Sequence, residues 1–224
     1  KKYHKTIDKN SDLIELVNVK QNTPPPLSLS FSGSDFSLPE DAIYEVRLAA
    51  PVLTDPGQLI FSLEYPGMVR IEKIYRFYHG TYNLDLEFKV SNLSGNAINQ
   101  YAILNWREFV DPQKEEDQYG HEGPVYLVAK SIEREEVKKI TEAKTVGPDI
   151  PWGGFESKYF IAAMIPQNPS LTSLSISKDT DNTVALNMKA PKNIIPAGQT
   201  SLSSYSLYLG PKDYSILRAR NVGL

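Results

Sequence analysis

The three histidines are the first side chains to weigh for chemistry, because imidazole serves both acid–base catalysis and zinc binding. They are His4, His79 and His121, and no two of them stand at an HxH or HExxH spacing. The chain has no cysteine, which excludes disulfides, a Cys-based zinc site and a Cys nucleophile. His79 is expected in a hairpin turn and His121 in an acidic loop, where exposed polar residues are ordinary. We therefore expect no metal site and no catalytic histidine.

Motifs for nucleophilic catalysis and phosphate binding give no better support for an enzyme. The sequence contains no GxSxG elbow and no phosphate-binding loop. Gly153 and Gly154 follow Trp152, but they lack the Lys-Ser/Thr pair and the helix that hold a phosphate. The sequence therefore predicts neither an enzyme nor a bound cofactor.

Four of the 13 tyrosines, Tyr75, Tyr78, Tyr82 and Tyr101, admit two interpretations. They could line a cleft that binds a sugar or a peptide. They could equally be strand residues whose hydroxyl groups reach solvent. The second interpretation is favoured, because aromatic residues are enriched in strands without any ligand.

The composition narrows the class of protein. The chain has 224 residues, with 24 Lys and Arg against 27 Asp and Glu, a formal net charge of −3. A nucleic-acid-binding domain would show a basic excess or a basic stripe, so no nucleic acid is expected as a partner. No run approaches the ~18 consecutive apolar residues of a membrane span, and no signal peptide is recognised. Because the chain lacks an initiator Met, we interpret it as a segment of a longer protein.

The elements that must carry any site are mostly strands. Apolar and polar residues alternate over 82–90, which indicates a strand of an antiparallel sheet with one face in water. Its apolar face holds Tyr82, Leu84, Leu86, Phe88 and Val90. Further strands are predicted at 13–19, 27–31, 43–48, 59–65, 69–77, 98–106, 159–165, 171–177, 183–188 and 201–209. Short strands separated by Pro, Gly, Asn and Ser clusters predict one mainly β domain over 1–224, with two large antiparallel sheets packed as a sandwich.

Two charged stretches interrupt this pattern. Residues 131–144 fit either a charged edge strand, which would resist aggregation, or a helix with a Glu135–Lys139 pair and a narrow apolar stripe. The strand is favoured, and in both cases the stretch is a solvated charged face. Residues 111–123 are predicted to be a long loop.

The C-terminal end of the sequence changes its periodicity. The alternation of strand 201–209 gives way to Gly210 and Pro211 and then to helical spacing, so a short helix is predicted over about 211–220. Gly210 would permit a kink, and Pro211 would suit the first helical turn because its missing N–H would be unpaired there. Asp213 is expected at the positive end of the helix dipole, with Arg218 and Arg220 in the last turn. Tyr214 and Leu217, at i and i+3, are expected to dock on the sandwich.

Two stretches are more specific than composition. The first is PWGGFESKYFIAAMIP (151–166), in which Trp152, Lys158, Tyr159, Phe160 and Pro166 stand out. The second is IIPAGQTSLSSYSLYLGPKDYSIL (194–217), which contains Gly198, Gly210 and Pro211. In this order, together with SDLIELVN near the start and the 61–92 region, they resemble the large periplasmic domain of the YidC-type membrane protein insertases. The resemblance covers essentially the whole chain and is strongest over 151–217, and these positions are expected to be structural.

The resemblance implies a fold, a place and a role. The fold would be an antiparallel β-super-sandwich similar to galactose mutarotase, with a short C-terminal helix that leads towards a transmembrane helix outside this chain. The domain would lie on the periplasmic face of the bacterial inner membrane and assist insertion without catalysis. Its partners would be the membrane-embedded remainder of the polypeptide, Sec translocon auxiliary subunits and nascent inner-membrane proteins. Tyr214, Leu217 and Arg218 are candidates for coupling, although Tyr214 and Leu217 could equally serve only to pack the helix.

Two other classes share the predicted architecture. A carbohydrate-binding or aldose-epimerase-like protein would need an acid and a base that face one cleft. A soluble carrier of lipoproteins or unfolded chains would need an exposed apolar groove. The insertase domain is favoured over both, because function lies in the site and not in the fold.

Overall fold

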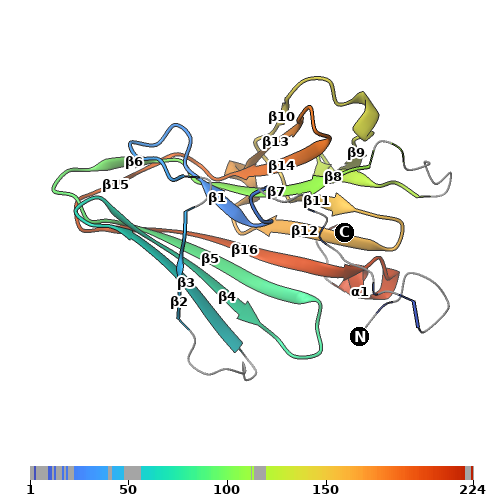
Figure 1. Ribbon diagram of the computed structural model, residues 1–224, viewed down its shortest axis with the longest axis horizontal. Coiled ribbons are helices and arrows are strands. Elements are labelled where there is room, and N and C mark those ends of the chain that lie inside the picture. The colour runs from blue at the N-terminus through green and yellow to red at the C-terminus, as the bar shows by residue number, and fades with distance from the viewer. Residues whose placement is uncertain are drawn as a thin grey trace.

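The computed structural model describes residues 3, 10, 11, 13, 17, 19, 23–39, 42–47, 57–111, 113, 120–219 and 223. It confirms a mainly β fold in which two antiparallel sheets lie face to face (Figure 1). The smaller sheet has the order β1 (Ser28–Ser30), β7 (Ile103–Phe109), β14 (Thr183–Lys189), β13 (Ser173–Lys178) and β10 (Lys144–Val146). Each of its pairings is antiparallel.

The larger sheet contains nine strands among the described residues. Its order is β2 (Glu45–Arg47), β3 (Gly57–Tyr65), β4 (Val69–Phe77), β5 (Asn83–Asn92), β16 (Thr200–Pro211), β12 (Phe160–Pro166), β11 (Trp152–Glu156), β8 (Gly123–Val128) and β9 (Ser131–Arg134). A separate ribbon pairs β15 (Asn193–Ile195) with β6 (Ile98–Gln100). Three short helices complete the described fold: η1 (Val137–Lys139), η2 (Pro169–Leu171) and α1 (Tyr214–Ala219).

The main core fills the space between the two sheets. Leu86, Phe88 and Val90 of β5 contribute to it with 0%, 1% and 1% exposure, and Leu174 and Met188 contribute from the smaller sheet. Burying one such side chain stabilises the fold by about 1.5–3 kcal/mol. The predicted alternation of β5 is therefore confirmed from residue 84 onward.

Tyr82 is the exception to that alternation. It precedes β5 and packs beside a second, smaller cluster that includes Tyr208, with the two ring centroids 6.2 Å apart. It therefore does not share the inner face with Leu84, Leu86 and their neighbours.

Most predicted strands correspond to observed ones, and 69–77 matches β4. The prediction of one strand over 98–106 was wrong, because Tyr101 and Ala102 interrupt it. The two resulting strands, β6 and β7, pair with different partners. The strands β8, β10, β11 and β15 were missed. Gly-Pro opens β8, and two glycines interrupt the pattern of β11. Most of the predicted 13–19 strand and 111–123 loop lies outside the described residues.

The 131–144 region combines a strand and a tight turn. All four residues of β9 are exposed, and β9 forms an edge of the large sheet, so the charged-edge interpretation is confirmed for 131–134. The chain then forms the 3-10 helix η1 and no α-helix between residues 131 and 144. Edge charges of this kind oppose pairing with another sheet.

A polar clamp joins the two sheets. Lys144 of β10 donates to Glu135 over 2.5 Å and to the Tyr126 hydroxyl of β8 over 3.0 Å. Tyr126 in turn donates to Glu135 over 2.7 Å. Burial disfavours the charge of Glu135, but the hydrogen bonds from Lys144 and Tyr126 outweigh it and lower the pKa of this carboxyl. The clamp fixes the end of the sandwich from which η1 projects.

A Pro-x-Gly-Gln turn, residues 196–199, lies at the start of β16. The amide of Gln199 donates to the carbonyl of Pro196 over 3.1 Å, and Gly198 has a φ of +72°. That conformation suits the third residue of a type II turn, which glycine adopts without a steric penalty. Gly198 therefore has a structural role.

Candidate functional site: the C-terminal helix and its polar anchor

The helix α1 lies against a second apolar cluster that is separate from the main core. Its buried members are Val125, Trp152, Ile161, Ala163 and Tyr208, from four neighbouring strands of the large sheet. The intervening residues of these strands, such as Phe155, Met164 and Leu207, belong to the main core instead. The second cluster therefore occupies the outer face of the large sheet, where an antiparallel sheet would otherwise meet water.

The approach to α1 differs from the sequence prediction. The strand β16 continues through Gly210 and Pro211, and Pro211 pairs with Phe160 of β12. Pro211 is thus the last strand residue and not part of the first helical turn, and the predicted helix over 211–220 is observed as Tyr214–Ala219. The carbonyl of Pro211 accepts a hydrogen bond from the Tyr208 hydroxyl over 2.7 Å. This contact ties the strand end to the outer-face cluster.

Gly210 serves close packing and not a kink. It pairs with Ile161 in the continuous ladder between β12 and β16. A Cβ at this position would lie 2.6 Å from Cγ of Tyr82, closer than real Cβ atoms approach a neighbour. Glycine therefore allows the Tyr82 ring to cover the strand just before α1.

Asp213 forms the N-terminal cap of α1. One carboxylate oxygen accepts hydrogen bonds from the amides of Ser215 and Ile216, at 2.9 Å and 3.1 Å. Such a cap satisfies amides that have no partner within the helix. The expectation that Asp213 lies at the N-terminal end of the helix is met at the cap position, and Arg218 lies in the last turn as expected. Arg220 lies outside the described residues.

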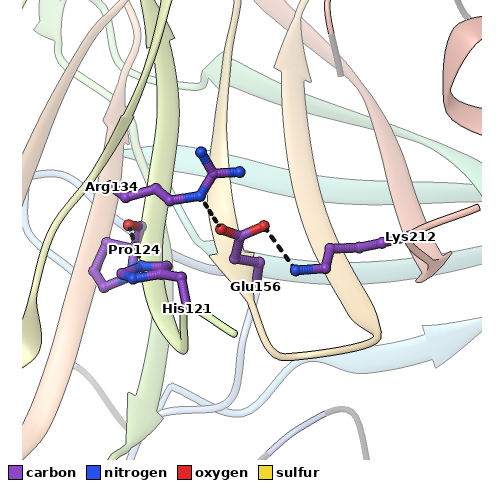
Figure 2. Close-up of polar contacts among 5 residues, drawn as sticks. All are labelled: His121, Pro124, Arg134, Glu156 and Lys212. Atoms are coloured by element: carbon purple, nitrogen blue, oxygen red, sulfur yellow. Dashed lines mark hydrogen bonds and ion pairs between the residues drawn. The ribbon is translucent and has the colours of Figure 1, made fainter. Parts of the chain in front are cut away.

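A buried carboxylate anchors the segment that leads into α1. The side chain of Glu156 is 3% exposed and receives Arg134 Nε at 2.5 Å and Lys212 Nζ at 3.2 Å. Figure 2 shows the two cations meeting the carboxylate from opposite sides. The amide of Lys212 also donates to the carbonyl of Tyr159 over 2.7 Å. Because a buried charge is tolerated only when paired, Glu156 holds Lys212 and the root of α1 in place.

His121 lies near this anchor without joining it (Figure 2). Its Nε2 is 3.2 Å from the carbonyl oxygen of Pro124, so it donates there in the Nε2–H tautomer. This contact fastens the chain just before β8. Among the described residues, no three His, Asp or Glu side chains gather into a metal-binding group.

The three coupling candidates divide between the two sides of α1. Leu217 is half-buried and packs on the outer-face cluster. Tyr214 is 73% exposed, and the guanidinium of Arg218 lies over its ring at 5.8 Å. The expectation that Tyr214 docks on the sandwich was therefore wrong: Tyr214 is the first residue of α1, and its ring packs against Arg218 of the same helix and not on the sheet.

The residues of the 151–166 motif occupy one hairpin. Trp152 and Phe160 are 1% and 7% exposed, and Pro166 is buried at the end of β12. Lys158 and Tyr159 are exposed in the connecting loop, with the Lys158 ammonium 5.4 Å from the centre of the Tyr159 ring. Among the described residues, no acceptor meets the buried indole nitrogen of Trp152.

Sequence reasoning missed the ionic anchor. Glu156 ends a short strand that was not predicted, and Arg134 and Lys212 are far from it in the chain. One signal was available, since the period of two places Glu156 on the same face as Trp152. Two of the tyrosines considered for a cleft have other partners: the Tyr78 hydroxyl donates to Asp85 over 2.6 Å, and the Lys192 ammonium lies 5.0 Å from the centre of the Tyr101 ring.

Comparison with known families gives a match over the complete chain. The family model for the YidC periplasmic domain matches residues 1–224. The membrane protein insertase YidC of Syntrophus aciditrophicus (strain SB) is 51% identical over 227 residues, and the one of Geobacter metallireducens is 27% identical over 230 residues. Each match includes 100% of this chain but only 42% of the relative. The chain thus spans less than half the length of these curated relatives.

Comparison with solved structures supports the predicted architecture. A galactose mutarotase related enzyme from Lactobacillus acidophilus aligns with a TM-score of 0.52 and 12% identity, over 76% of this chain and 72% of that chain. The galactosidase domain of an alpha-galactosidase-sucrose kinase, AgaSK, aligns with a TM-score of 0.53 and 14% identity, over 85% and 29% of the two chains. These similarities establish the mutarotase-like sandwich fold alone. None of the helices formed by the described residues has the length and apolar character needed to cross a bilayer.

Proposed function

We propose that this chain, which belongs to the YidC periplasmic domain family, is a non-catalytic domain over 1–224 of a membrane protein insertase. In this proposal it lies on the periplasmic face of the bacterial inner membrane and continues into the membrane-embedded remainder of the polypeptide. It assists the insertion and folding of inner-membrane proteins as a scaffold or partner-binding module. The 42% share of the relatives that the chain spans supports this, because more than half of their length lies outside it.

The proposed role of α1 is to couple the domain to that membrane-embedded remainder. The observation that carries it is the Glu156 anchor, which fixes Lys212, the residue directly before the helix cap. A helix with a fixed root transmits the position of the sandwich to whatever follows it. A helix on a loose linker would not.

The outward side of α1 supports contact with another protein surface. Tyr214 and Arg218 form an exposed aromatic–cation pair, and both residue types are enriched at protein interfaces. Leu217 faces the sheet and positions the helix. We therefore assign contact to Tyr214 and Arg218 and positioning to Leu217.

The proposal of partners other than the same polypeptide rests on family membership. Sec translocon auxiliary subunits and nascent inner-membrane proteins are the proposed ones, and the net charge of −3 gives no reason to add nucleic acid. The sugar-active neighbours are too distant to support a carbohydrate function. No observation within the described residues favours such a site over the coupling role.

The test uses the full-length insertase that contains this chain, in cells depleted of their own insertase. The double variant Tyr214→Ala/Arg218→Ala should lower insertion of a reporter membrane protein severalfold while leaving the thermal midpoint of the domain unchanged. The matched control is Lys158→Ala/Tyr159→Ala, which removes an exposed cation–aromatic pair from a loop. Equal insertion by both variants and the parent would overturn the coupling role.

A further inference from the structure

A pocket of about 500 Å³ lies on the inner face of the large sheet, away from α1. Its floor is formed by Leu59, Phe61, Lys73, Tyr75 and Phe77 of β3 and β4. Its opposite wall comes from the start of the described chain, and includes Pro25, Pro26, Ser28, Leu29, Pro39, Ala42 and Tyr44. The volume and the apolar lining with a few polar groups are typical of a site for a small ligand.

Lys73 is the unusual member of this lining. The alternation of β4 places it on the inner face between Ile71, which is 0% exposed, and Tyr75. Its neighbours on the adjacent strands are both phenylalanines, Phe61 and Phe88. A lysine in such apolar surroundings is rare unless its ammonium group has a partner.

Among the described residues, the partners of the Lys73 ammonium are neutral. Nζ donates to the backbone carbonyl of Leu27 over 2.6 Å and lies 5.7 Å and 5.6 Å from the ring centres of Tyr44 and Tyr75. Leu27 has a φ of +61°, a conformation that is unfavourable for residues with a side chain. In the part of the chain that the structure describes, no carboxylate reaches Lys73 within ion-pair distance.

A second polar group of the pocket is also unsatisfied. The hydroxyl of Ser28, on β1, is buried and has no hydrogen-bond partner within the described residues. Lys73 therefore supplies the ammonium of this pocket, while the Ser28 hydroxyl is buried within its wall.

We propose that this pocket binds a single-chain amphiphile with a carboxylate head, such as a fatty acid, whose head meets Lys73 and whose chain lies along Leu29, Leu59 and Phe77. A carboxylate offers the negative charge and the acceptor oxygens that the other neighbours of the Lys73 ammonium do not supply. The apolar lining suits an alkyl chain better than a peptide, whose backbone would need hydrogen-bond partners along its length. This proposal is independent of the coupling role of α1.

The titration of the pocket agrees with an anionic ligand. Burial lowers the pKa of Lys73 to about 8, so the amine is charged at neutral pH and readily influenced by a bound anion. Burial raises the pKa of Tyr44 to about 12, with Tyr65 adding to the effect, and it also raises the pKa of Tyr75. Both tyrosines that face the ammonium are therefore neutral, and Lys73 is the cation that a carboxylate would meet.

The test measures binding of dodecanoate, dodecanol and dodecylamine to the chain by isothermal titration calorimetry at neutral pH. Dodecanoate should bind to the parent chain. Lys73→Met should weaken the binding of dodecanoate by roughly tenfold or more and leave the affinity for dodecanol unchanged. Shortening the carboxylate should weaken binding by roughly fourfold per methylene. Raising the pH above the pKa of Lys73 should weaken dodecanoate in the parent but not in Lys73→Met.

Two variants control for folding and for surface charge. Lys89→Met removes a lysine from the opposite face of the neighbouring strand β5 and should leave dodecanoate binding unchanged. Ala42→Trp keeps Lys73 but fills the pocket wall, and it should abolish binding of both dodecanoate and dodecanol. Equal affinity for dodecanoate and dodecanol, or unchanged binding in Lys73→Met or Ala42→Trp, would overturn the proposal. The proposal would also be overturned if an amidated apolar peptide displaced dodecanoate and bound the parent and Lys73→Met with the same affinity.

Discussion

The anchor of α1 and the inner pocket each place one ionisable group away from bulk water, and they treat it in opposite ways. Glu156 is almost completely buried and meets two cations, Arg134 and Lys212. Lys73 meets a neutral carbonyl and two tyrosine rings. Paired buried charges position chain segments, whereas an ionisable group with spare hydrogen-bonding capacity and an adjoining cavity suits a ligand. The comparison separates a structural role from a binding role within one sandwich.

The largest effect is expected when the anchor loses both of its cations. Arg134→Met/Lys212→Met leaves the Glu156 carboxylate buried and unpaired, which should lower the free energy of unfolding by about 3–5 kcal/mol. Urea denaturation followed by tryptophan fluorescence measures this loss. Adding Glu156→Gln should recover most of it, because a neutral amide does not need a cation. A loss below about 1 kcal/mol would mean that water reaches the carboxylate and that the anchor does not fix the helix.

Replacing the pocket cation, Lys73, is expected to raise the free energy of unfolding, whereas removing the cations of the anchor lowers it. Because burial lowers the pKa of Lys73 from 10.5 to about 8, folding is penalised while this amine is charged. The penalty is complete below pH 8 and disappears as the pH rises through 10.5, so stability rises over that window. Lys73→Met should therefore stabilise the chain by about 2–3 kcal/mol at pH 7.

The measurement for Lys73 is the difference in unfolding free energy between parent and Lys73→Met as a function of pH. It should shrink from pH 8 to pH 10.5, and Lys89→Met should show no such trend. A destabilised Lys73→Met would show that the amine is satisfied by the fold itself. The contrast with Glu156 would then disappear.

The sequence predicted the strands that form the floor of the pocket better than the strand that carries the anchor. Period-two alternation located β4 and β5, because both faces of these strands have clear and different environments. It also contained Lys73, at the position where an apolar residue was due, but alternation alone does not reveal a cavity. The strand β11 escaped detection, since Gly153 and Gly154 pack closely between neighbouring strands and carry no pattern.

The site was harder to predict than the fold because its contacts are distant in sequence. Glu156 meets a residue 22 positions before it and another 56 positions after it. The family resemblance pointed to the correct hairpin and helix, yet it did not indicate which charge would be buried. The orientation of Tyr214 also depended on where α1 begins, three residues later than predicted.

Glu108 provides an intermediate case, with a smaller expected effect. Burial raises the pKa of this β7 carboxyl to about 7, the indole of Trp106 opposes the shift with a hydrogen bond of 2.8 Å, and the charge of Glu122 adds to it. Because the folded pKa lies above the unfolded value of 4.5, the stabilisation is present below pH 4.5 and is lost as the pH rises through 7. Glu108→Gln should remove this dependence and stabilise the chain at pH 8 by about 1–2 kcal/mol, since Glu108 remains partly exposed.

Thermal unfolding of the parent and Glu108→Gln between pH 4.5 and pH 8 distinguishes this case from the other two. Replacing Glu108 should change the stability less than replacing Lys73, because the indole of Trp106 donates a hydrogen bond to the Glu108 carboxylate. Glu122→Gln is the control, because it removes only the neighbouring charge and should reduce the pH dependence slightly. If Glu108→Gln unfolds with the same pH dependence as the parent, one indole hydrogen bond is enough to hold a buried carboxylate. The number of charged partners would then not be what separates the anchor from the pocket.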